Sequence, residues 1–163
     1  MGRQTKIPKT DLAYIAGFLD GDGSVMVQMK NRRNNPRGWR LMFTICFYQD
    51  TRHEKPLFWI KKTLGIGYIS RRKDGITELR INGFGRAKEI LESLSPYIKF
   101  KKKQVDILLT ILKQIVGKNF PDLTRKQRLK IADMIYESRQ LTYQSGWKKF
   151  SKSRKELRKR LGF

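Results

Sequence analysis

The sequence predicts an α+β protein in which an antiparallel β-sheet is backed by helices on one face. Two observations support this fold class. An apolar helical segment is followed by two segments in which apolar and polar residues alternate, and the same order then occurs again before a third helix. The resulting order is αββαββα, and packing the helices on one face of the sheet buries the apolar side of both.

The first half contains one helix and two strands. The helix is expected to begin at Thr10, a residue type that caps helix N-termini, and to end at the segment Gly21-Asp22-Gly23. Gln49 closes the second strand. The strands, with a polar and basic hairpin loop between them, are expected over residues 24–30 and 39–48.

The second half repeats this pattern and continues into an extension. Its helices and strands are expected over residues 54–64, 68–72, 77–82, 86–94 and 102–116. Residues 121–163 predict two further helices, and the second, from Trp147 to Leu161, is rich in lysine and arginine. We therefore expect a single domain over residues 1–163, with a core over about residues 8–117 and a basic helical extension over about residues 118–163.

The chain is strongly basic. It contains 37 Lys+Arg against 14 Asp+Glu, a formal net charge of +23, which predicts a polyanionic partner: nucleic acid first, an anionic membrane second. Cys46 is the single cysteine and His53 the single histidine, which argues against a disulfide framework, structural zinc and a Cys–His nucleophile. The sequence has no apolar run of membrane-spanning length and no secretory signal, so a soluble, intracellular protein is expected.

Small residues recur along the first helix. Ala13, Gly17 and Gly21 are spaced every four residues and share one row, which allows another helix to approach closely. Glycine inside a helix costs about 1 kcal/mol relative to alanine, so the pattern indicates a packing contact.

Two acids stand at the end of this helix. The Asp22 carboxylate and the free carbonyls of the last turn together suit a hard divalent ion such as Mg²⁺. The alternative is that Asp20-Gly21-Asp22-Gly23 is only a turn that leaves the helix.

Residues 15–23 resemble the LAGLIDADG motif of homing endonucleases. The match lies at Ala16, Gly17, Asp20, Asp22 and Gly23. One copy is present, as in the single-motif branch of the family, whose members act as homodimers with their motif helices packed at the two-fold axis. The resemblance implies a site-specific, intron-encoded endonuclease that makes a Mg²⁺-dependent double-strand break in a long, pseudo-palindromic DNA target.

The resemblance also implies a set of site residues. Asp22 and the Gly21 carbonyl would hold the metal, with two or more divalent ions shared across the dimer. Gln49 would orient water, and Lys101 would polarise water or offset charge on the phosphate, although Lys99 or Lys103 could take that place. His53 stands where relatives have a basic residue; it could relay a proton, touch phosphate or simply lie at the surface. The dimer interface would comprise Ala13, Ala16, Gly17, Asp20 and Gly21, with Asp20 in a structural role.

The outer face of the sheet is expected to contact DNA, although alternation alone is equally typical of a solvated face. Its expected positions are Met26, Gln28, Lys30, Arg32, Arg40, Met42, Thr44, Cys46, Tyr48, Ser70, Arg72, Glu78, Arg80 and Asn82. Arg33, Asn34 and Arg37 would extend the contact from the hairpin loop. Phosphate contacts are expected from Lys99, Lys101, Lys102, Lys103 and the basic residues between 148 and 160, for which a solvated helix face is the alternative.

One other function class competes with the nuclease. Some family members act as intron-RNA-binding maturases without cleavage, so intron RNA is a further candidate partner. The combination of Asp22, Gln49 and Lys101 favours cleavage, because RNA binding requires none of them. An organelle (chloroplast or mitochondrion) or the prokaryotic cytoplasm is the expected location.

Overall fold

The computed structural model describes residues 7–34, 38–142 and 153–163. Its helices are α1 (Lys9–Asp22), α2 (Lys55–Leu64), α3 (Gly85–Leu94), α4 (Lys102–Ile115), α5 (Arg125–Gln140) and α6 (Arg154–Arg160). Its strands are β1 (Gly23–Asn31), β2 (Trp39–Asp50), β3 (Tyr68–Arg71) and β4 (Ile76–Asn82). Three short 3₁₀ turns are η1 (Thr51–His53), η2 (Ser95–Tyr97) and η3 (Phe120–Asp122).

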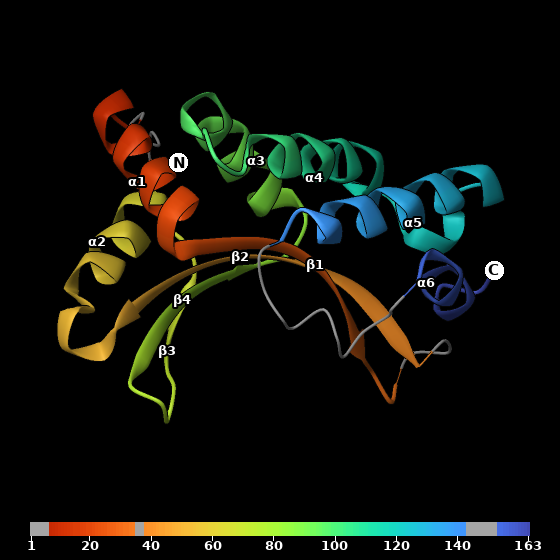
Figure 1. Cartoon of the computed structure of the whole chain (residues 1–163), viewed down its shortest axis with the longest axis horizontal. Helices are drawn as coiled ribbons and strands as arrows, with labels where there is room; N and C mark the ends of the chain where they lie inside the picture. The colour runs from red at the N-terminus through yellow and green to blue at the C-terminus, as the bar shows by residue number, and fades with distance from the viewer. Residues whose placement is uncertain (1–6, 35–37, 143–152) are drawn as a thin grey trace.

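The four strands form one antiparallel sheet in the order β1-β2-β4-β3. Figure 1 shows the helices gathered on one side of the sheet, while both ends of the sheet bend away from them, so the opposite face is concave. The α+β class and the αββαββα order are confirmed. The helices in the described ranges are all too short or too polar to span a lipid bilayer.

Alternate residues of the central strands build the core. Phe43, Ile45 and Phe47 of β2 point toward the helices and are fully buried, as are Leu79 and Ile81 of β4. Burying one such side chain contributes about 1.5–3 kcal/mol. This row fixes the strand register, because a shift by one residue would turn the whole apolar set to the other face.

The start of α1 differs from the prediction. The helix begins at Lys9 and its N-cap is Pro8, with no side chain capping the first turn. Thr10 therefore lies inside the helix, and the predicted Thr10 cap is wrong. Pro8 suits the boundary because it lacks a backbone N–H and cannot adopt the interior helical hydrogen bond. The predicted end of α2 at Gly65 is confirmed, with φ of 67° at that glycine.

The C-terminal extension packs on the rest of the fold through α5. Thr124 and Gln127 form a capping box at its start. At its far end, Arg139 Nη2 donates to the Val27 carbonyl of β1 at 3.4 Å. Only the last part of the predicted helix Trp147–Leu161 lies in the described ranges, as α6; Arg37, Lys148, Lys149 and Lys152 lie outside them.

Candidate functional site

The end of α1 holds a lysine from a distant part of the chain. Lys101 Nζ donates to the Leu19 carbonyl at 3.1 Å, to the Asp20 carbonyl, and to the Gly21 carbonyl at 3.4 Å. An ammonium here offsets the negative pole of the helix dipole. Burial lowers the pKa of Lys101 despite the opposing charges of Asp20 and Asp22.

The Asp20 carboxylate positions this lysine. It accepts hydrogen bonds from the backbone N–H groups of Lys99, Phe100 and Lys101, at 2.6, 2.8 and 2.8 Å. Burial by itself would raise the pKa of Asp20, but the three N–H donors and the Lys101 charge outweigh it and hold the pKa below its usual value. The result is a rigid link between the end of α1 and the start of α4, in line with the structural role predicted for Asp20.

The sheet brings the end of β2 to the same place. Gly23, which follows Asp22, pairs with Phe47, which lies two residues before Gln49 on β2. Asp22 is exposed, and Gln49 is half-buried with its Oε1 accepting from the Asp50 N–H at 2.8 Å. This bond turns the Gln49 amide nitrogen, a donor, away from the backbone.

His53 follows these residues at the end of η1. The turn is capped by Asp50, whose carboxylate accepts from the Arg52 backbone N–H and from Nε and Nη2 on one edge of the Arg52 guanidinium. Hydrogen bonds from Arg52 hold the pKa of Asp50 well below its usual value. The His53 side chain is exposed and makes no hydrogen bond or ion pair with the side chain of any residue that the structure describes. The structure therefore leaves the role of His53 as a prediction.

The donor set at the end of α1 fits a magnesium ion that keeps most of its waters. Across the described ranges, His, Cys, Asp and Glu side chains nowhere gather in threes that could hold a metal ion. One subunit offers the exposed Asp22 carboxylate and the Gly21 carbonyl, which also accepts from Lys101 Nζ at 3.4 Å but has a second lone pair. The Asp20 carboxylate is already occupied by backbone donors. Mg²⁺ in proteins is commonly bound by one or two carboxylates together with water and substrate phosphates.

The row of small residues on α1 faces solvent. Gly17 and Gly21 are exposed, and a Cβ added at either would meet no atom within 4 Å. Ala13 is half-buried. Ala16 and Asp20 turn toward the subunit's own interior, with 0% and 7% exposure. The predicted interface needs correction at these two positions, because each is one residue further around the helix than the exposed glycines.

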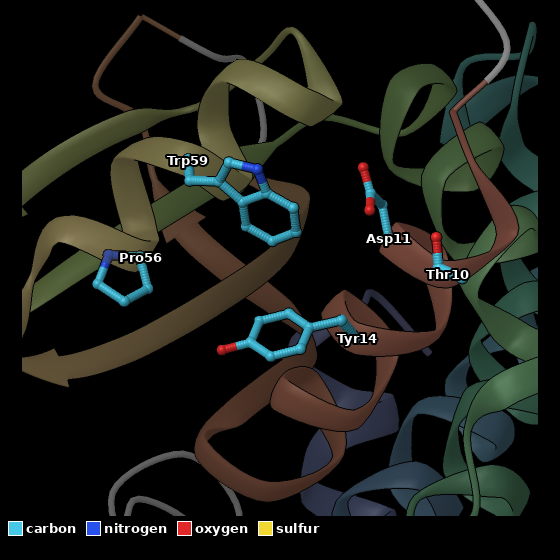
Figure 2. Close-up of a pocket in the computed structure, with 5 residues that line it drawn as sticks. All are labelled: Thr10, Asp11, Tyr14, Pro56 and Trp59. Atoms are coloured by element: carbon cyan, nitrogen blue, oxygen red, sulfur yellow. The ribbon is translucent and has the colours of Figure 1, made fainter.

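Aromatic side chains flank this row of small residues. The sequence predicted the row but not the aromatic residues beside it. Tyr14 is 56% exposed and packs edge-on against Trp59 of α2, with ring centroids 5.5 Å apart. Figure 2 shows α1 and α2 facing each other across a pocket of about 530 Å³ lined by Thr10, Asp11, Tyr14, Pro56 and Trp59. Phe100, beside the end of α1, is 83% exposed. One feature of the sequence could have predicted an exposed aromatic residue here: Trp59 lies outside the apolar stripe that Leu57 and Ile60 form on α2.

The strand register confirms which residues share the open face of the sheet. Three rows run across it: Met26, Thr44 and Asn82; Cys46, Arg80 and Tyr68; Tyr48, Glu78 and Ser70. Hydrogen bonds join neighbours in this face, from Thr44 to Asn82 at 2.8 Å and from Asn82 to Tyr68 at 3.1 Å. Tyr68 is 47% exposed and belongs to the face although it was not predicted there.

Three predicted contacts on this face are covered by their neighbours. Thr44 and Cys46 are fully buried and Glu78 is 6% exposed. Burial raises the pKa of the Cys46 thiol to about 11. These side chains support the face from beneath, because longer neighbouring side chains lie over them. Arg32, Arg33 and Asn34 at the hairpin are exposed, as predicted.

Part of the predicted phosphate-contacting set is engaged within the subunit. Lys102 Nζ lies 2.6 Å from Asp106, and Arg158 makes two hydrogen bonds to Asp133 at 3.0 and 2.6 Å. Arg154 lies over the Tyr136 ring, 5.3 Å from its centroid. The contacts of Arg154 and Arg158 attach α6 to α5. Lys99, Lys155 and Lys159 are exposed, as is Lys103, whose Nζ lies 3.9 Å from Glu137.

Comparison with known proteins gives consistent similarities. The family model described as LAGLIDADG endonuclease matches residues 15–115. DNA endonuclease I-CvuI from Chlorella vulgaris is 29% identical over 123 residues, 76% of each chain. DNA endonuclease I-CreI from Chlamydomonas reinhardtii is 31% identical over 119 residues, 72% of each chain. The crystal structure of the homing endonuclease I-CvuI in complex with its target, in the presence of Ca, aligns with a TM-score of 0.79 at 26% identity and covers 94% of this chain and 96% of that one.

Proposed function

The chain belongs to the LAGLIDADG endonuclease family, and from this membership we propose that it is a site-specific homing endonuclease that cuts both strands of a long, pseudo-palindromic DNA as a homodimer. The observation that carries the proposal is the anchoring of Lys101 on the last carbonyls of α1, including that of Gly21 next to Asp22, where the chain enters the sheet. Helix α1 also forms the proposed dimer surface, and the sheet forms the proposed DNA surface. A soluble basic RNA-binding protein would need none of these contacts.

The DNA duplex would lie against the concave face of the sheet (Figure 1). Two-stranded β-ribbons fit the major groove, and the exposed Lys30 and Arg40 together with the half-buried Gln28 supply side-chain types that distinguish base edges. The exposed lysines at 99 and 103 would contact phosphates, which fixes the register without reading sequence.

A second copy of the chain would complete the site. Gly17 and Gly21 are open within the subunit, so nothing in the subunit itself explains two helical glycines. Exposed Tyr14 and Phe100 beside them add apolar surface that a partner would cover. A two-fold axis through this row would bring two Asp22 carboxylates together, one for each DNA strand.

The chain's own residues would divide the chemistry between them. Asp22 and the Gly21 carbonyl would hold Mg²⁺, which supplies Lewis acidity toward the scissile phosphate and lowers the pKa of water. Gln49 would donate its amide N–H to orient the attacking water. Lys101 would place its charge beside the phosphate. Because Asp20 binds the Lys101 backbone N–H and the end of α1 binds its ammonium, the lysine would not have to move during the reaction.

The test is cleavage selection from a randomised duplex library with Mg²⁺, comparing wild type, Asp22→Asn and Asp122→Asn. Asp122 is an exposed acid in η3 and serves as the matched control. Cut ends that share a pseudo-palindrome should appear with wild type and the control and be absent with Asp22→Asn or with a chelator. Equal cleavage by Asp22→Asn would refute the assigned role. A folded dimer that binds DNA but never cuts it would favour the RNA-binding maturase.

A further inference from the structure

Glu78 is an acid embedded in the face proposed to contact DNA. It lies in the row of Tyr48 and Ser70, near the middle of the sheet, and is only 6% exposed. A bare carboxylate here would repel the DNA phosphates and would be costly to bury. Its surroundings must therefore compensate the charge.

Two arginines provide this compensation, one on each oxygen. Arg72 Nη1 lies 3.3 Å from Oε1, and Arg80 Nη1 lies 3.3 Å from Oε2. Arg72 is also held by Asp74 at 2.5 Å. The Arg72 guanidinium is thus held through both terminal nitrogens, Nη1 by Glu78 and Nη2 by Asp74. The two arginine side chains nevertheless remain 49% and 27% exposed, so both still reach the surface of this face.

This geometry changes the role that the residue type suggests. A carboxylate that reads DNA directly would accept from the cytosine amino group, which requires an oxygen at the surface. Both Glu78 oxygens instead face guanidinium groups beneath that surface. A long arginine side chain loses rotamer freedom when it is immobilised, so holding it in place before DNA arrives removes part of the binding cost.

The positions of the arginines suggest what they read. Arg80 lies one row from Glu78 on β4, and Arg72 leaves β3 on the other side, with its N–H bonded to the Ile76 carbonyl. Both guanidinium groups converge on one carboxylate, so they lie close enough to address neighbouring base pairs. A guanidinium presented to the major groove pairs with O6 and N7 of guanine.

We propose that Glu78 is a positioning residue for sequence recognition: its carboxylate holds Arg72 and Arg80 so that they select guanine at two neighbouring positions in each half-site. The inference rests on the proposed function, because it requires DNA on this face of the sheet. The inference goes beyond the proposed function because it assigns guanine specificity to Arg72 and Arg80 and an indirect, positioning role to Glu78.

The experiment is a binding selection from the randomised duplex library, without cleavage, for wild type, Glu78→Gln and Glu89→Gln. Glutamine keeps the size of Glu78 and removes its charge, and Glu89, an exposed acid on α3, is the matched control. We expect two neighbouring positions to lose about tenfold or more of their guanine preference in Glu78→Gln while the remaining positions keep theirs. Arg72→Gln and Arg80→Gln should each lose one of the two, and neither loss should add to that of Glu78→Gln.

Three results would overturn the inference. Glu78→Gln could keep the wild-type profile, could weaken every position equally as a structural defect would, or could lose a cytosine preference at a single position. If Glu78→Gln does not fold, Arg72→Lys and Arg80→Lys provide the test instead. Lysine keeps the positive charge but lacks the paired N–H donors of the guanidinium, so a retained guanine preference would overturn the inference. The wild-type cleavage selection tests the proposed function separately, because the binding profiles do not depend on cutting.

Discussion

Adding a single methyl group at Gly17 should change the stability of the subunit and the stability of the dimer in opposite directions. Within the subunit the position is exposed, and a Cβ would meet no atom within 4 Å. Gly17→Ala should therefore add the helix preference of alanine, about 1 kcal/mol, to the free energy of unfolding of the isolated subunit. That gain corresponds to a rise of about 2–4 °C in Tm for a chain of this size.

The same methyl should weaken the dimer. If two α1 helices pack through this row, each new methyl occupies space taken by the partner's backbone, and overpacking costs about 1–3 kcal/mol per site. The two-fold axis doubles the cost to about 2–6 kcal/mol, which raises the dimer dissociation constant about 30-fold to 20,000-fold.

Sedimentation equilibrium measures the association, and thermal unfolding at low protein concentration measures the subunit. Gly85→Ala is the control, because Gly85 is also exposed and open but lies at the start of α3. A Gly17→Ala chain that is stabilised yet dimerises as tightly as wild type would refute the packing of α1 on its copy.

Two further predictions concern the link between α1 and the rest of the site. Gly23→Ala should destabilise the fold by about 3 kcal/mol in chemical denaturation, because its Cβ would lie 2.8 Å from the Leu19 backbone; an unchanged unfolding midpoint would contradict this. Asp20→Asn should cost about 2 kcal/mol, since an amide leaves at least one of three backbone N–H groups without an acceptor. Because folding lowers the pKa of Asp20, its contribution is present above the unfolded value near 3.9 and is lost as pH falls through the folded value, so wild type and Asp20→Asn should converge in stability in acid and diverge toward neutral pH.

The sequence alone predicted the elements, their order and the two faces of the sheet. These follow from local periodicity: apolar residues at helical spacing, alternation in strands, and glycine where a helix ends. The row of Gly17 and Gly21 was visible in the same way, because residues four apart must share one side of a helix.

Only the tertiary structure decided which residues meet and which are covered. Asp20 and the 99–101 backbone are about 80 positions apart, and no local pattern reports that contact. Alternation placed Glu78 and Cys46 on the open face correctly, yet their burial depends on how far neighbouring side chains reach over them. The direction of a side chain is set by its own strand, whereas its burial is set by all the neighbouring side chains of the surface. The proposed division between residues that read DNA and residues that position others depends on burial.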